Sequence, residues 1–104
     1  MGQPVQIPHW ALGWNQCRWG YNDTDALKKV VKGYADAEIP LDTQWSDIDW
    51  MNNYKSFEHD PVNFKDLPEF VEDLHAKDMH YIPILDAGVA KRSEGYQAYT
   101  DGVD

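Results

Sequence analysis

Residues 41–51 read LDTQWSDIDWM, and the architecture of the chain can be worked out from this segment. It begins with alternating apolar and polar residues, the pattern of a half-buried β-strand, which predicts a strand over residues 41–46. It ends with two acids, Asp47 and Asp49, set among tryptophans. Because a carboxylate is costly to bury, we expect this strand to end at a wet cleft with aromatic walls. Such a cleft suits a sugar, since aromatic rings pack against its C–H faces while carboxylates accept hydrogen bonds from its hydroxyls.

Two further segments have the pattern of strands. Residues 10–16 are short and rich in apolar side chains, and they lead into residues 17–21 (CRWGY), which resemble the end of the first segment in composition. Residues 79–86 form the third predicted strand, although Pro83 cannot donate a hydrogen bond to a neighbouring strand. Polar side chains therefore gather where each predicted strand ends.

Two amphipathic helices separate these strands. In the first, apolar residues recur at i, i+3, i+4 and i+7, namely Leu27, Val30, Val31 and Tyr34. Asp23 or Thr24 can cap this helix, and residues 39–40 (IP) end it. The same spacing recurs in a second helix, at Leu67, Phe70, Val71 and Leu74. There Asp66 at the cap, followed three residues later by Glu69, resembles a capping box.

The predicted order is β-α-β-α-β, an α/β arrangement in which right-handed crossovers give a parallel sheet. Ligands of such folds bind at the carboxyl ends of the strands. No Gly-x-Gly-x-x-Gly or phosphate-loop pattern follows the first strand, which leaves a (β/α)8 TIM barrel or a portion of one. Three β/α units are fewer than half of the eight that a barrel needs. We therefore expect residues 1–104 to form part of a barrel domain, without a second domain.

Composition excludes several classes of partner. The chain has 104 residues and a net charge of −9, which disfavours nucleic acid and anionic membranes. The single cysteine, Cys17, is expected to be a small buried residue. The four histidines show no metal-ligand spacing, so neither a metal site nor a cofactor is expected. Residues 22–24 (NDT) match an N-glycosylation acceptor, but such residues are also common at a helix start, where Asp or Thr caps, and we favour that interpretation. The acceptor pattern hints at the secretory pathway and leaves the compartment open.

The longest motifs resemble glycoside hydrolase family 31. Residues 10–21 (WALGWNQCRWGY) resemble the opening strand of the catalytic barrel of that family, and residues 39–51 (IPLDTQWSDIDWM) resemble its second-strand motif. Phe57 and residues 74–75 and 84–86 match the family at the spacing it has beyond the second strand. The resemblance implies a retaining α-glucosidase fold and a substrate with a terminal α-linked glucose.

The resemblance also implies roles for particular residues. The acid matching Asp47 binds hydroxyls of the sugar in the subsite that is cleaved, and Trp19, Ile48 and Ile84 match positions that line this subsite. Asp86, at the next strand end, is a further candidate. The motif of the catalytic nucleophile, a Trp-x-Asp-Met-Asn-Glu type run, does not occur, and neither does the acid/base segment. No catalytic residue is therefore assigned, and the isolated chain is expected to be inactive.

Other polar and aromatic residues are expected to be structural. Asp49 is predicted to hold nearby backbone N–H groups or Arg18. Trp10, Trp14 and Trp45 are predicted to lie in the core. Two other functions stay open: a non-catalytic carbohydrate-binding module that uses the aromatic surface alone, and a metal-dependent glycosyltransferase in which Asp47 and Asp49 form an Asp-x-Asp site.

Overall fold

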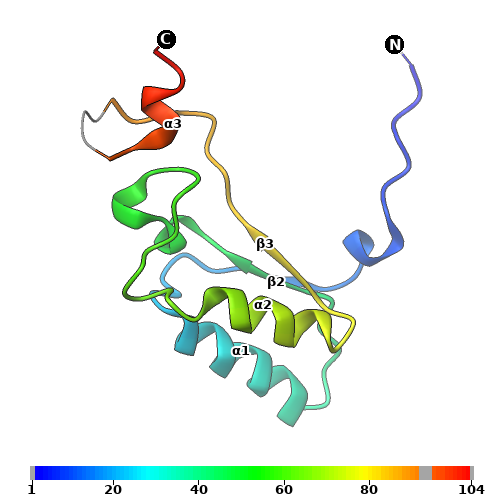
Figure 1. Cartoon of the computed structure of the whole chain (residues 1–104). Helices are drawn as coiled ribbons and strands as arrows, with labels where there is room; N and C mark the ends of the chain where they lie inside the picture. Colours follow the sequence, from blue (N-terminus) through cyan, green and yellow to red (C-terminus); the bar gives the residue numbers. More distant parts are fainter. Residues whose placement is uncertain (1, 92–94, 104) are drawn as a thin grey trace.

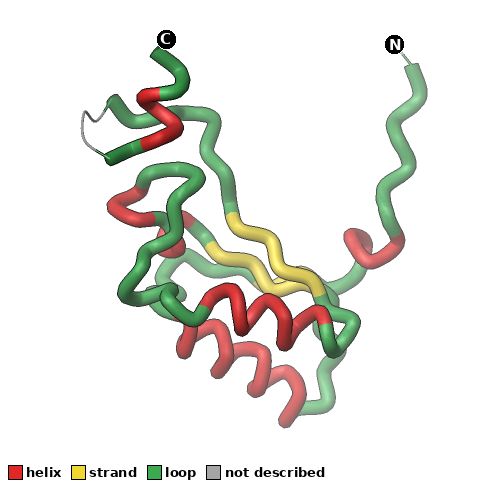
Figure 2. The backbone as a smooth tube through the Cα atoms, viewed as in Figure 1, coloured by secondary structure: helices red, strands yellow, loops and turns green. Residues whose placement is uncertain are grey.

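The computed structural model describes residues 2–91 and 95–103. Three strands and two longer helices alternate, and short helical turns occupy the connections (Figures 1 and 2). In chain order the elements are η1 (His9–Leu12), β1 (Asn15–Gln16), α1 (Thr24–Asp36), β2 (Thr43–Ser46), η2 (Ile48–Trp50), η3 (Asn52–Tyr54), α2 (Leu67–His75), β3 (His80–Pro83) and α3 (Gln97–Thr100).

The strands form one parallel sheet in the order β1-β2-β3, as the alternation of strands and helices predicts. Thr43 of β2 pairs with Asn15 on one side and with His80 on the other. Both α1 and α2 lie against the same side of this sheet (Figure 1). The β-α-β-α-β order is therefore confirmed for the described residues.

The two helices follow their apolar stripes, but only one of them has the predicted cap. Asp23 accepts a hydrogen bond from Ala26 N at 2.6 Å and so caps α1 as expected. Asp66 precedes α2 without any side-chain cap hydrogen bond, so the predicted capping box is wrong. Its backbone is not extended (φ −93°, ψ 12°), which is not the usual conformation of a capping residue, and Pro68 in the first turn has no N–H to be capped.

The side chains of the sheet divide between a covered and an open face. Tyr81 packs edge-on against Phe70 of α2, with ring centroids 6.2 Å apart, so it faces the helices. Its neighbours His80 and Ile82 must point the other way, because side chains alternate along a strand. The ring of Trp10, in η1, stacks on His80 at 3.9 Å and covers part of this open face.

Polar residues occupy much of the layer between sheet and helices. Gln44 pairs with Tyr81 in register and therefore shares its face, and Ser46 lies two residues further along β2. Both are completely buried. Gln16 of β1 accepts a hydrogen bond from the Tyr34 hydroxyl of α1 at 2.5 Å, which joins the helix to the sheet edge.

Several details differ from the sequence predictions. The first strand spans two residues instead of 10–16, because residues 9–12 turn into a 3-10 helix. The short helix α3 was not expected after Gly88. Cys17 is exposed and not buried, since it lies in the loop beyond β1. The three tryptophans predicted for the core are not buried, and Trp14 is 57% exposed.

The open sheet makes the molecule flat. Its radius of gyration is 16.0 Å, with extents of 49, 45 and 22 Å, whereas a compact domain of this length has about 13 Å. The extended N-terminal segment adds to the spread (Figure 2). Beyond that, the sheet has helices on one face only, whereas parallel sheets usually occur with both faces covered.

Candidate carbohydrate site at the strand ends

Because the three strands are parallel, the loops that follow them leave the sheet at the same end, where the carboxyl ends of the strands lie. We call this end the carboxyl edge of the sheet. Residues 17–22 follow β1, residues 47–51 follow β2, and residue 84 begins the segment after β3. All the residues predicted from sequence to contact a ligand lie in these three segments. The fold therefore gathers them at the edge where ligands of parallel α/β proteins bind.

Hydrogen bonds hold the three loops together. Gly20 N donates to Asp49 Oδ2 at 2.9 Å, so Asp49 fixes the loop after β1, as predicted for this carboxylate. Gly20 has a φ of 107°, a left-handed conformation that favours glycine. Trp50 Nε1 donates to the carbonyl oxygen of Ile84 at 2.9 Å and joins the loop after β2 to the end of β3.

Asp47 begins the turn η2 and lies near the loop after β1. Its Oδ1 accepts a hydrogen bond from Ile48 N at 2.7 Å, which leaves Oδ2 free of hydrogen bonds to the described residues. Partial burial raises the pKa of the Cys17 thiol, and the nearby Asp47 carboxylate raises this pKa further. Asp49, two residues beyond Asp47, accepts the hydrogen bond from Gly20 N, next to Trp19. The turn that Asp47 begins therefore lies beside the loop that carries Trp19.

The remaining predicted residues differ in exposure. Trp19 is 69% exposed, so its ring is available to a ligand. Ile48 and Ile84 are partly buried and pack against the hydrophobic core. Asp86 is exposed, beyond the end of β3. The structure thus places all five predicted residues at one edge of the sheet, with the two isoleucines as its apolar support.

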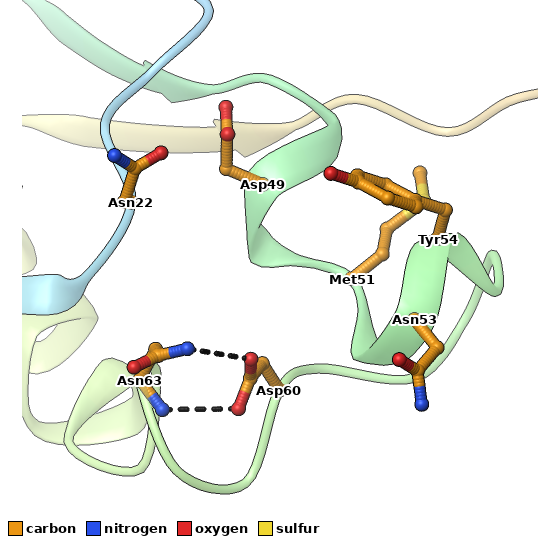
Figure 3. Close-up of a pocket in the computed structure, with 7 residues that line it drawn as sticks. All are labelled: Asn22, Asp49, Met51, Asn53, Tyr54, Asp60 and Asn63. Carbon is orange, nitrogen blue, oxygen red and sulfur yellow. Dashed lines mark hydrogen bonds between the residues drawn. The ribbon is translucent and has the colours of Figure 1, made fainter.

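A polar pocket lies beside this edge and was not predicted. Its volume is about 230 Å³, and it is lined by Asn22, Asp49, Met51, Asn53, Tyr54, Asp60 and Asn63 (Figure 3). Among the predicted structural residues only Asp49 reaches it. Asp60 accepts hydrogen bonds from the backbone N–H groups of Asn63 and Val62, and these bonds lower the pKa of its carboxyl group. The sequence signal was the Asp-Pro-Val-Asn run at 60–63, which is typical of a turn closed by the Asp side chain.

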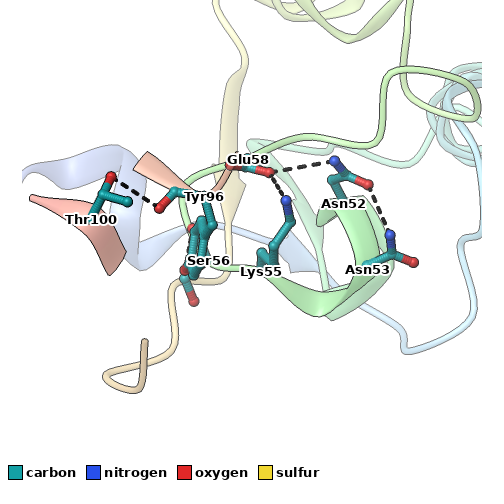
Figure 4. A network of polar contacts seen from close by, with 7 residues as sticks. All are labelled: Asn52, Asn53, Lys55, Ser56, Glu58, Tyr96 and Thr100. Atoms are coloured by element: carbon teal, nitrogen blue, oxygen red, sulfur yellow. Dashed lines mark hydrogen bonds and ion pairs between the residues drawn. The ribbon is translucent and has the colours of Figure 1, made fainter. Parts of the chain in front are cut away.

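The segment after β2 is fixed from outside by the segment near the C-terminus. The Tyr96 hydroxyl donates to the carbonyl oxygen of Ser56 at 2.9 Å, and the ring is completely buried. Lys55 Nζ lies 5.2 Å from the centre of this ring and pairs with Glu58 at 2.5 Å (Figure 4). Tyr96 therefore connects the 52–58 loop to the chain beyond β3.

Within residues 2–91 and 95–103, no three His, Cys, Asp or Glu side chains are grouped so that they could hold a metal ion. Across the same residues, every helix is too short or too polar to cross a membrane.

Carboxylates and aromatic rings at the carboxyl edge of a parallel sheet, with helices on its outer face, define a β/α-barrel type of ligand site. Residues 4–104 match the model of the TIM-barrel domain of glycosyl hydrolases family 31. The chain belongs to this glycoside hydrolase family.

Known proteins agree with this assignment. Glucoamylase 1 of Candida albicans is 46% identical over 91 residues, which are 86% of this chain and 10% of that protein. The α-glucosidase of Schizosaccharomyces pombe is 38% identical over 112 residues, covering 100% of this chain and 12% of that protein. The crystal structure of the glucosidase II α subunit bound to Glc1Man2 superposes with a TM-score of 0.83 at 28% identity, over 88% of this chain and 10% of that one. The chain thus spans about a tenth of the length of these relatives.

Proposed function

We propose that this chain forms the first β/α units of a retaining α-glucosidase barrel and supplies one wall of the pocket for a terminal α-linked glucosyl unit. The observation that carries the proposal is the hydrogen bond from Gly20 N to Asp49 Oδ2, which joins the turn begun by Asp47 to the loop bearing Trp19 at the carboxyl edge of the sheet. The free oxygen of Asp47 accepts hydrogen bonds from two sugar hydroxyls, and the exposed Trp19 ring covers the apolar face of the ring. Ile48 and Ile84 form the floor, and Asp86 accepts a further hydroxyl.

The chemistry of cleavage belongs to residues outside this segment. Retention needs two carboxyl groups about 5–5.5 Å apart, one as nucleophile and one as acid/base. Asp49 accepts a hydrogen bond from the Gly20 N–H group, and Asp47 accepts one from the Ile48 N–H group. Both carboxylates are therefore suited to binding and support. The isolated chain therefore binds α-glucosides weakly and does not hydrolyse them, and the rest of the barrel is its partner. The exposed Asn22 of the glycosylation pattern supports a protein of the secretory pathway.

A chimeric enzyme tests this assignment. The segment replaces its 91-residue counterpart in the Candida albicans glucoamylase, and Asp47→Asn is compared with Asp25→Asn in the exposed first turn of α1. Hydrogen bonds to charged groups are worth about 1.5–3 kcal/mol, so Asp47→Asn should lower kcat/KM by about 10- to 150-fold. Asp25→Asn should change it less than about twofold.

Two outcomes would contradict the proposal. An Asp47→Asn chimera that keeps full activity would show that Asp47 does not contact the sugar. Robust hydrolysis of a chromogenic α-glucoside by the isolated chain would show that the catalytic acids lie within it. Tight binding of maltose without hydrolysis would instead favour a carbohydrate-binding module, since part of a pocket binds weakly.

A further inference from the structure

A groove runs between α1 and α2, on the side of the molecule away from the candidate sugar site. Its volume is about 390 Å³. The lining residues of α1 recur at helical spacing (28, 31, 32 and 35), and those of α2 recur in the same way (70, 73 and 74). Lys77, just beyond the end of α2, extends this lining. Each helix thus turns one stripe toward the other. The two stripes leave a groove between them, although α1 and α2 are neighbours.

The floor of the groove is apolar. Val31 of α1 meets Phe70 and Leu74 of α2, and Met79 closes the end near β3. Met79 is half-buried and Ala35 is exposed, so part of this apolar lining remains accessible to solvent. A side chain inserted from outside would contact Ala35 and Met79, above the buried Val31, Phe70 and Leu74.

The rim of the groove is basic, in a chain that carries a net charge of −9. Lys28, Lys32 and Lys77 line it, against the single acid Asp73. Lys32 pairs with Asp36 at 2.5 Å, while Lys28 and Lys77 have no ion-pair partner among the described residues. An apolar floor with a positive rim is complementary to an apolar segment that carries acids.

Completion of the barrel would not cover this groove. The strands that extend the sheet must pair beyond β1 or beyond β3, at its two edges. Their helices would then lie outside α1 and α2, which are neighbours on one face of the sheet (Figure 1). The groove lies between α1 and α2. The occupant therefore has to come from elsewhere.

We propose that this groove binds an acidic amphipathic helix of a partner protein. Its apolar residues, at i, i+3 or i+4, lie along the groove between α1 and α2, and its flanking glutamates face Lys28 and Lys77. Such helix-in-groove binding uses a few apolar anchors for affinity and charges for orientation.

A labelled synthetic peptide provides the test. The probe is an 18-residue helix with leucines on one face and glutamates beside them, and its binding to the full chain is followed by fluorescence anisotropy. A scrambled peptide of equal composition and a peptide with lysines in place of the glutamates serve as controls. We expect only the amphipathic acidic peptide to bind, with an affinity that falls as salt rises.

Variants of the chain locate the binding surface. Lys28→Glu with Lys32→Glu should weaken binding by at least about tenfold, and Ala35→Trp should do so by filling the groove without changing its charge. The matched control is Lys29→Glu with Lys65→Glu, which makes the same charge change at exposed lysines outside the groove and should alter binding less than about twofold. Circular dichroism confirms that each variant keeps its helices.

Three results would overturn the proposal. The first is the absence of binding by the acidic amphipathic peptide. The second is equal weakening by the two lysine pairs, which would indicate general attraction of charge. The third is equal binding of the scrambled or the lysine-bearing peptide, which would show that neither the apolar face nor the charge is recognised.

Discussion

Tyr81 is the residue at which burial and polarity conflict most. Among the described residues, its buried hydroxyl has no hydrogen-bond partner. The same holds for Ser46 Oγ and Gln44 Oε1, which lie on the same covered face of the sheet. Unpaired buried polar groups cost about 1–3 kcal/mol each. The layer between sheet and helices is thus less stable than an apolar layer of the same shape.

This conflict predicts the effect of Tyr81→Phe. Removing the hydroxyl should raise the free energy of unfolding by up to about 1–3 kcal/mol at neutral pH, because an unpaired group is deleted while the ring stays against Phe70. Urea unfolding followed by circular dichroism measures the change. A destabilised variant would mean that the hydroxyl is paired in solution.

The same residue sets an alkaline limit to stability. Burial raises the pKa of Tyr81 to about 12, from an ordinary value near 10. Its neutral form therefore favours the folded state below pH 10, and this contribution is lost as the pH rises from 10 through about 12. The free energy of unfolding of Tyr81→Phe should fall less steeply with pH over that range than that of the unchanged chain. Tyr54→Phe, at a 65% exposed tyrosine, is the control and should leave the pH dependence unaltered.

At the scale of one element, α1 begins through a single side-chain contact. Asp23→Ala removes the acceptor of the Ala26 N–H group and should cost about 0.5–2 kcal/mol of stability. Asp66→Ala is the matched control, because Asp66 precedes α2 but makes no cap hydrogen bond. Urea midpoints compare the two variants. Equal effects would show that general charge near the helix start, and not capping, is responsible.

The loop after β2 depends on Tyr96 in a similar way. Tyr96→Phe removes its hydrogen bond to Ser56 and keeps the buried ring, so the loss should be about 0.5–1.5 kcal/mol. The effect should be local, since the bond connects residues 52–58 to the C-terminal segment. Hydrogen exchange should speed up in that loop and stay unchanged in α1. Uniform acceleration throughout the chain would contradict this local role.

These elements show what sequence could and could not predict. The stripes of α1 and α2 were predictable because burial along a helix repeats every 3.6 residues. The alternation in β2 located the strand, but it could not tell which face the helices cover, and the polar Thr43, Gln44 and Ser46 are its buried residues. Residues 10–14 were predicted to belong to a strand, because apolar composition alone does not distinguish a strand from a helical turn. Residues 10–12 instead lie in η1, where the Trp10 ring stacks on His80.

The candidate site was predictable to a different extent. Parallel strands bring the three polar loops to one edge, and this follows from element order alone. The hydrogen bond between Gly20 and Asp49 joins residues 29 positions apart, and no local pattern identifies such a partner. The pocket around Asp60 and Asn63 was missed because its lining comes from two connections, residue 22 between β1 and α1 and residues 49–63 between β2 and α2.

At the scale of the whole molecule, one face of the sheet is covered only in part, by the Trp10 ring, and neither outer strand pairs with a further strand among the described residues. A second groove, lined by Tyr21, Val30, Tyr34 and Ile39, lies on the side of α1 away from α2. Parallel sheets are normally covered on both faces, and open edges pair with other chains. The isolated chain should therefore be marginally stable and should aggregate. A sharp, reversible thermal transition in a monomer would contradict this expectation.

The variant Ile82→Lys should act differently in the isolated chain and in a complete barrel. In the isolated chain Ile82 lies on the open face, half-buried. A lysine there should reduce aggregation, measured by light scattering, without loss of helical signal, because charges discourage sheet faces and edges from associating. In the chimeric glucoamylase the same face becomes the barrel interior, where an unpaired charge costs far more, so activity should fall by at least about tenfold. Val62→Lys, at a 74% exposed position away from the sheet, should change neither property. A chimera that tolerates Ile82→Lys would mean that this face of the sheet does not point into a barrel.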